Sequence, residues 1–424
     1  MELVHYKLFG HRMSEAMKKF VQNLSWSFFG GILAAFIMFG INIFIGRLLG
    51  PEEYGKYNAI LSLATAISVF IVAGMDVSSI RFIADKKYSK FKKNIFTTTL
   101  TVVVFNLFFV AISFLIIEFS TQEMLFKTNA TREYLSVVIV LFFTGVISLK
   151  TVFNGFLRAF QQIKEQSVLK FLDAIMVAVL IVIFFILMKK RENVFYVWSV
   201  IGGGIFFSSG AFMLLRGYFG RLNFKLFKKI FLIYNRFVLV STFMGALLFL
   251  DKFLIGKFIG MRELGIYSAY YIASHGVISE LSGILMNVLW PSVIENKNHL
   301  SEIVKKTNKI FIIFFIPIML TIIGITTLFF SFYGQNFSFQ WRYICLFSIN
   351  TFMGMLFSLY LSYLNIQHIK KGVIIQSFLF VGVSLFTLII FKNIFVYLIV
   401  QIITQILLTV YISLFLLGKF KKNC

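Results

Sequence analysis

The chain has 424 residues, of which 59% are hydrophobic and 14% are charged, and its mean hydropathy is +0.88. Soluble domains carry roughly a quarter charged residues, so no water-soluble fold could bury this much apolar surface. The apolar runs are about twenty residues long, which predicts an all-α protein that crosses a membrane many times rather than a barrel of short alternating strands. The formal charge of +24 is largely explained by basic residues in cytoplasmic loops, so binding to nucleic acid is not predicted.

Twelve membrane-spanning helices are predicted in chain order, joined by connections too short to hold a soluble domain. The first six cover residues 24–45, 58–80, 95–117, 134–157, 168–188 and 194–215. The second six cover residues 237–256, 266–290, 309–332, 342–364, 372–391 and 395–417. The chain therefore divides into an N-terminal lobe at 1–215, a basic cytoplasmic linker at 216–236 and a C-terminal lobe at 237–424.

The distribution of basic residues predicts the orientation of these spans. With both termini in the cytoplasm, the inner segments hold 27 Lys and Arg residues and the outer connections hold 10. Basic residues accumulate on the cytoplasmic side because they resist translocation, so this orientation is favoured over its reverse. The segment KKRE at 189–192 is a local exception, since it is predicted to lie outside.

One short sequence occurs twice, 210 residues apart. GRLLGPEEYGKYNAI at 46–60 and GKFIGMRELGIYSAY at 256–270 are identical at 6 of 15 aligned positions. The same offset places the first span on the seventh, and six spans in each half make both halves enter the membrane from the same side. The sequence thus predicts two similar six-helix lobes, related by a pseudo-two-fold axis along the membrane normal and separated by a central cavity.

The glycines of the first copy also predict a local structure. Gly46 and Gly50 are expected to bracket a turn at the outer end of the first span. Pro51 is expected to end the first helix, and Gly55 is expected to let the chain re-enter the membrane.

Two stretches resemble a known family. GRLLGPEEYGKYNAILSLATAISVFIVAGMDVSSIRFIA at 46–84 resembles the N-terminal signature of the polysaccharide biosynthesis, or oligosaccharide flippase, family, which includes the Wzx-type O-antigen flippases. DKFLIGKFIGMRELGIYSA at 251–269 is similar to the phrase that opens the second lobe in that family. The family is part of the multidrug/oligosaccharidyl-lipid/polysaccharide exporter superfamily.

This resemblance implies a function, a location and partners. The expected cargo is a polyprenyl-diphosphate-linked oligosaccharide, an O-antigen or capsule repeat unit, moved from the cytoplasmic to the periplasmic leaflet of the bacterial inner membrane. The resemblance implies no cofactor and implies coupling to a proton or sodium gradient, with the ion left open by the residues. Membrane lipid and other polysaccharide-assembly membrane proteins are the further expected partners.

Charged residues inside predicted spans are candidates for the transport path, since a charge at mid-bilayer costs about 2.5–3.5 kcal/mol on insertion scales. In span four, Lys150, Asn154 and Arg158 recur every four residues on one helix face. Cations there would replace the hydration and counterions that a diphosphate loses on leaving water. Lys150 is the best single candidate for a cavity cation, and snorkelling to the inner interface is the alternative, which suits Arg158 better.

Two other charged pairs occur in the first half of the chain. Lys170 and Asp173 are three residues apart in span five, where a structural salt bridge is the alternative to a role in transport. Asp76 and Arg81 close span two at its cytoplasmic end, where helix capping and packing explain them as well as ion coupling does.

The second lobe has its own charged residues. Asp251 and Lys252 interrupt span seven, and neighbouring helical residues point about 100° apart, so we expect one to face the cavity and the other a partner within its lobe. In span eight, His275 and Glu280 are candidate proton carriers. Polar contacts between helices are the alternative for both residues.

Two further classes of function compete with a flippase. A multidrug or cation-coupled exporter of the same superfamily would share the architecture. A membrane-bound glycan polymerase, ligase or transferase is disfavoured, because the chain shows no extended external loop and no defensible Ser-His-Asp grouping or acidic Asp-x-Asp motif. The two cysteines, Cys345 and Cys424, lack the spacing of a metal site or disulfide framework, so neither a metal nor a catalytic residue is predicted.

Overall fold

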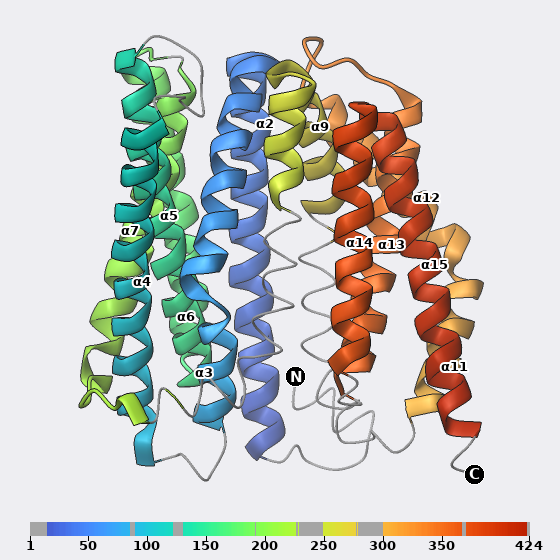
Figure 1. Cartoon of the computed structure of the whole chain (residues 1–424), viewed down its shortest axis with the longest axis horizontal. Helices are drawn as coiled ribbons and strands as arrows, with labels where there is room; N and C mark the ends of the chain where they lie inside the picture. The colour runs from blue at the N-terminus through green and yellow to red at the C-terminus, as the bar shows by residue number, and fades with distance from the viewer. Residues whose placement is uncertain are drawn as a thin grey trace.

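The computed structural model shows helices throughout both halves of the chain (Figure 1). The first lobe contains α2 (Glu15–Val72), α3 (Met75–Ala84), α4 (Lys92–Thr121), α5 (Ala130–Ala159), α6 (Ile163–Ile181) with a π-helical end (Val182–Leu187), and α7 (Asn193–Leu215). The second lobe contains α9 (Met261–Tyr271) with a π-helical end (Ile272–Gly276), α11 (Leu300–Ile313), α12 (Phe315–Ser331), α13 (Trp341–Ile366), α14 (Lys370–Phe391) and α15 (Ile394–Lys421).

The structure describes residues 15–84, 90–121, 130–190, 192–225, 228, 249–276, 278, 300–366 and 370–421. Within these ranges there is no strand. Seven helices are long and apolar enough to cross a membrane, or eight when the bent pair α11 and α12 is counted as one span. The predicted all-α, multi-pass class is confirmed, and the count of twelve spans stays a prediction.

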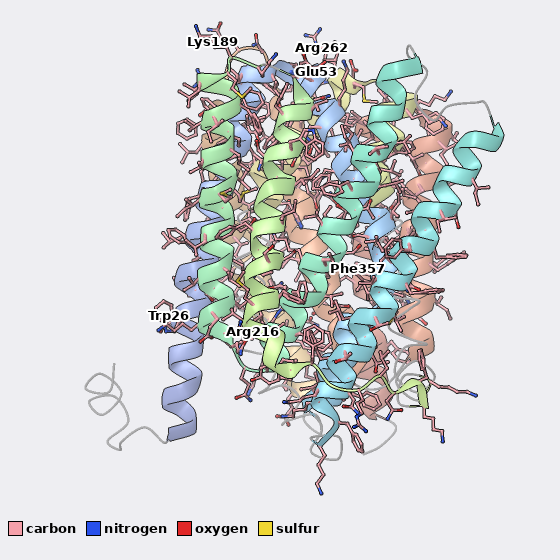
Figure 2. All side chains as sticks on the ribbon, turned by 90° about the vertical axis from the view of Figure 1, so that its left-hand side faces the viewer. Trp26, Glu53, Lys189, Arg216, Arg262 and Phe357 are labelled. Carbon is pink, nitrogen blue, oxygen red and sulfur yellow. The ribbon has the colours of Figure 1, made fainter. Side chains whose placement is uncertain are left out.

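The two lobes stand side by side. In Figure 1 the first lobe occupies the left of the view and the second the right, and α2 and α9 meet between them at the top. Figure 2 places Glu53, Lys189 and Arg262 at this same end, whereas Arg216 lies toward the opposite one. The charge distribution predicts that the first three residues lie outside and Arg216 inside. We therefore call the end that carries Glu53 the outer end, and the opposite end the inner end.

The helix α2 contains the first two predicted spans. Figure 1 shows it running to the outer end and returning as a second helix beside the first. Only Gly50 leaves the helical region, with φ 76° and ψ 171°. The expected turn bracketed by Gly46 and Gly50 is therefore narrower than predicted, because Gly50 alone makes it. Pro51 begins the returning helix, where its missing N–H has no helical partner to lose, and Gly46 and Gly55 are helical.

The second copy of the repeated sequence has the same backbone. Gly260, which directly precedes α9, has φ 147° and ψ 157°. Residues other than glycine essentially never adopt this region, which Gly50 also occupies. Glycine recurs at these two positions because each lobe needs the same sharp reversal at its outer end.

The predicted ninth span differs from the observed helices. The chain is already helical at Leu300, and α11 and α12 meet at an angle of 61°. Pro317 lies four residues after Ile313 and cannot donate a hydrogen bond to its carbonyl group, which explains the break at Phe314. The span predicted over 309–332 is therefore bent near its start, and the helix that precedes the bend begins earlier, at Leu300.

The buried side chains form one core at the outer end and separate cores farther in. The largest described cluster joins residues of both lobes, among them Tyr54, Tyr196, Tyr267, Tyr333 and Tyr397. A second cluster, around Phe96, Phe156 and Phe207, belongs to the first lobe, and a third, around Tyr360, Phe380 and Ile412, belongs to the second. The lobes are thus packed together at the outer end, while toward the inner end each described lobe has a core of its own.

Candidate functional site

An ion pair joins α5 to α6 in the first lobe. Lys150 Nζ donates a hydrogen bond to Asp173 Oδ2 and lies 5.6 Å from the centre of the Phe207 ring on α7. The helix α7 can approach because Gly203 has no side chain, and a Cβ there would lie 2.6 Å from Asp173 Oδ1. The pair therefore lies where α5, α6 and α7 converge, and the structure pairs Asp173 with Lys150 rather than with Lys170 as predicted.

The two members of this pair differ in exposure. The side chain of Lys150 is 37% exposed, whereas that of Asp173 is 10% exposed. Oδ1 of Asp173 has no hydrogen-bond partner within the described residues. Lys150 is therefore the more exposed member of the pair, and Asp173 is largely buried.

The rest of the predicted stripe on α5 lies closer to the inner end. Asn154 Oδ1 accepts a hydrogen bond from Gln166 Nε2 on α6, and Arg158 is exposed in the last turn of α5. Lys150 precedes the end of α5 at Ala159 by nine residues, which is about 13 Å along a helix. The position of Arg158 agrees with snorkelling, so Lys150 is the cation of this stripe that lies deep in the span.

In the second lobe, Asp251 is buried and accepts three hydrogen bonds. Tyr267 on α9 donates at 2.9 Å and Tyr397 on α15 at 3.3 Å, both to Oδ2. The backbone N–H of Lys252 donates to Oδ1 at 2.5 Å. These donors compensate the carboxylate for the water it has lost. All of these donors belong to the second lobe.

The side chain of Lys252 lies against aromatic rings instead. Its Nζ is 4.1 Å from the centre of the Tyr271 ring, a cation–π contact. The Tyr271 ring is 4.9 Å from the ring of His275, which lies in the π-helical end of α9. No ion pair within 4 Å joins Lys252 to a carboxylate among the described residues, so the ammonium group of the cluster of Lys252, Tyr271 and His275 has an aromatic ring as its direct contact.

The first lobe has a neutral counterpart of the Asp251 network. Asn42 Oδ1 on α2 accepts hydrogen bonds from Tyr54 at 3.3 Å and from Tyr196 on α7 at 3.2 Å. Tyr196 and Tyr397 each occupy the fourth position of the last helix of their lobe. Each lobe thus uses a side-chain oxygen of its first span to accept hydrogen bonds from two tyrosines.

These tyrosines are absent from the residues predicted from the sequence. The available signal was the repeat itself, because Tyr57 and Tyr267 are 210 residues apart. In the first lobe the rings of Tyr57 and Tyr196 are 4.1 Å apart, and in the second those of Tyr267 and Tyr397 are 6.4 Å apart. A tyrosine that recurs at the offset of 210 residues is thus a candidate site residue.

The remaining predicted residues are placed as follows. Asp76 lies in the first turn of α3, where the positive end of the helix dipole favours a carboxylate. Lys170 lies in α6, and Arg81 lies in α3, although its side chain is outside the described part. Glu280 lies outside the described residues altogether. Within the described part of the chain, no group of three or more His, Cys, Asp or Glu residues could hold a metal ion.

The sequence matches a family of known proteins over most of its length. The family of polysaccharide biosynthesis proteins matches residues 20–297, which is more than half of the chain. The chain belongs to this family. A comparison of this chain with curated proteins found no match.

Solved structures share the fold of this polysaccharide biosynthesis protein. An inward-facing multidrug resistance MATE family transporter of the MOP superfamily aligns with a TM-score of 0.62 and 14% identity, over 92% of this chain and 96% of that one. An outward-facing transporter of the same description aligns with a TM-score of 0.63 and 12% identity, over 94% and 96%. Both coverages exceed nine tenths, so most of this chain shares the fold of these two transporters. The TM-scores for the inward-facing and the outward-facing transporter hardly differ. They therefore show a shared helix arrangement and do not distinguish the inward-facing from the outward-facing conformation.

Proposed function

We propose that this polysaccharide biosynthesis protein flips a polyprenyl-diphosphate-linked oligosaccharide, an O-antigen or capsule repeat unit, from the cytoplasmic to the periplasmic leaflet of the bacterial inner membrane. The cargo would cross between the two lobes, which open in turn toward either side, with both termini in the cytoplasm. The observation that carries the proposal is that each lobe of this family member holds a lysine inside a predicted span, Lys150 in the first lobe and Lys252 in the second.

The chemistry of the cargo explains why cations are needed. A diphosphate cannot enter hydrocarbon unaided, because burying its charges costs far more than any contact with lipid returns. An ammonium group replaces part of the lost hydration through charge-assisted hydrogen bonds. The polyprenyl tail needs no such help and can stay in lipid while the head group moves between the lobes.

The two ammonium groups lie at different depths. Lys150 lies about 13 Å from the inner end of α5, and Lys252 precedes the outer turn at Gly260 by eight residues, about 12 Å along a helix. In this proposal Lys150 receives the diphosphate after entry from the cytoplasm, and the cluster of Lys252, Tyr271 and His275 receives it on the outer side. A proton or sodium gradient would drive the cycle. Asp251 and His275 are the described candidates for coupling, since Asp173 is paired with Lys150.

Complementation of flippase-deficient cells tests this proposal. Cells that lack their own flippase and express this chain should regain surface polysaccharide, and their lipid-linked repeat unit should no longer accumulate on the cytoplasmic side. The carrier-linked intermediate is quantified by extraction and chromatography. Continued accumulation, with the protein present in the membrane at normal level, would contradict the proposal.

A multidrug exporter is the second candidate, because the similar solved structures are described as multidrug resistance transporters. It predicts a different outcome in the same cells. Expression would lower susceptibility to cationic drugs and leave the accumulated lipid-linked repeat unit unchanged. The two measurements made on one strain therefore distinguish the candidates.

A further inference from the structure

Two glycines lie where the backbones of the two lobes approach each other closely, Gly55 on α2 and Gly265 on α9. A Cβ built at Gly55 would overlap the carbonyl oxygen of Met261 and lie 3.0 Å from the N atom of Gly265. A Cβ built at Gly265 would overlap the carbonyl oxygen of Pro51 and lie 3.0 Å from its Cα. No side chain fits at either position without moving the backbone of the opposite lobe.

These two contacts are the same contact made twice. Gly265 follows Gly55 by 210 residues, and Met261 follows Pro51 by 210 residues. Gly55 contacts Met261, Gly265 contacts Pro51, and Met261 is the counterpart of Pro51 in the second lobe. Reciprocal contacts of this kind arise where two equivalent surfaces meet on a two-fold axis, so the pseudo-symmetry axis of the lobes passes through this crossing.

Further contacts between the lobes surround the glycine crossing. The hydroxyl groups of Tyr54 and Tyr333 are 3.4 Å apart, and both side chains are fully or almost fully buried. The ring of Tyr333 lies on Gly46, where a Cβ would come within 2.7 Å of its Cε1. Small residues again allow close approach of an element from the other lobe, as they do between helices packed in membranes.

A second level of contacts lies deeper in the membrane. The rings of Phe39 on α2 and Phe329 on α12 are 4.3 Å apart, and Ser62 Oγ donates a hydrogen bond to the carbonyl oxygen of Phe249. Phe39 and Phe249 are again 210 residues apart, so the first helix of each lobe contacts the other lobe here. In the outer half of the protein, the two lobes therefore contact each other at two successive depths.

We propose that Gly55 and Gly265 form the outer gate of the transporter, a symmetric backbone contact that lets the lobes close and that any side chain holds open. The inference rests on the proposed function only in taking the lobes to separate during transport. A contact between backbones has no side chains to withdraw, so opening requires movement of whole lobes. Closing requires both glycines, because each lobe supplies half of the contact.

Labelling of a cysteine below the gate tests the proposal. In a chain with Cys345→Ser and Cys424→Ser, Ser62→Cys places a thiol beneath the crossing, at a position that is buried. Cells or spheroplasts are treated from outside with a membrane-impermeant maleimide. The parent should label slowly, and Gly55→Leu and Gly265→Leu should each raise the rate about fivefold or more, which is the lower end of the shift that overpacking a close contact causes.

Two glycines of the same protein provide matched controls. Gly40 on α2 and Gly324 on α12 have nothing within 4 Å of a built Cβ among the described atoms, so Gly40→Leu and Gly324→Leu should label as slowly as the parent. If leucine lowers the amount of protein in the membrane, Gly55→Ala and Gly265→Ala replace these variants. They carry the smallest side chain and should also label faster than the parent.

Three outcomes would overturn the proposal: slow labelling of the Gly55 and Gly265 variants at normal protein level, fast labelling of only one of them, or equally fast labelling of the controls. The assay contains no cargo. A failure of the gate therefore shows in the labelling rate, and a failure of the proposed function shows in the carrier analysis.

Discussion

At the scale of single residues, the buried carboxylate of the first lobe is paired with a lysine on a neighbouring helix. Asp173 binds Lys150 on α5, although Lys170 is three residues away on its own helix. Spacing along one helix finds neighbours on that helix, and it contains no information about which helix packs against it. The correct partner required the packing of α5 against α6, which is a property of the tertiary structure.

Substitution of this ion pair separates a role in transport from a role in folding. Lys150→Met removes the cation and leaves Asp173 without its partner, so both the amount of protein and export should fall. Asp173→Asn keeps the cation and the shape, so export should stay near the parent level. The double variant should restore protein level but not export, which should remain roughly tenfold low because a charge-assisted hydrogen bond to the cargo is lost.

Surface polysaccharide in complemented cells and protein level in membranes are the two measurements for these variants. Normal export by the double variant would show that Lys150 serves only to pair with Asp173. The exposure of Lys150, 37% against 10% for its partner, is the reason to expect the opposite.

At the scale of elements, the outer turn of each lobe depends on one glycine. The repeated sequence correctly indicated a turn at this place, and its Gly and Pro residues supplied the signal. The expected extent was wrong because local sequence signals do not show where helical hydrogen bonds resume. In the structure they resume at Pro51, so Gly46 and Gly55, which look like turn residues, serve as sites of close approach between lobes.

Replacement of Gly50 isolates the cost of its backbone conformation. Gly50→Ala should destabilise the protein by about 1–3 kcal/mol, since φ 76° with ψ 171° is essentially restricted to glycine. A Cβ at Gly50 meets nothing within 4 Å in the described part, so packing contributes little. Gly40→Ala is the control, because Gly40 lies in the same helix with the same open surroundings.

Thermal unfolding of the purified variants in detergent measures this difference. The midpoint for Gly50→Ala should fall, whereas that for Gly40→Ala should stay or rise slightly, because alanine is favoured over glycine inside helices by roughly 0.5–1 kcal/mol. Equal midpoints for the two variants would show that the break at Gly50 carries no strain for other residues.

At the scale of the whole molecule, one core joins the lobes at the outer end and separate cores lie toward the inner end. Figure 1 shows α2 starting and α15 finishing at the inner end. This end is predicted to face the cytoplasm, because the inner segments hold 27 Lys and Arg residues and the outer connections hold 10. The closed end of this conformation is therefore the end that is predicted to face outward.

Reporter fusions test this orientation. Green fluorescent protein fused after residue 421 should fluoresce, and alkaline phosphatase inserted after Lys190 should be active, since the first reporter matures in the cytoplasm and the second is active only outside it. A dark fluorescent protein after residue 421 together with an inactive phosphatase after Lys190 would reverse the orientation and would place the glycine crossing on the cytoplasmic side.

The sequence alone determined the class, the two lobes and the charged residues of the spans. These follow from composition, from apolar runs of bilayer length and from a repeat with a constant offset, all of which are properties of residues near one another or in register along the chain. Asp251 and Lys252 were found in this way, and their expected divergence to different surroundings follows from helix geometry.

Only the tertiary structure decided the partners. It brought Tyr267 and Tyr397 to Asp251 from helices more than a hundred residues apart, and it placed Gly55 against Gly265. Such contacts depend on how helices cross, which is fixed by packing among many side chains at once and leaves no periodic trace in the sequence. The function of a glycine as a turn or as a close contact between lobes is therefore decided by the fold.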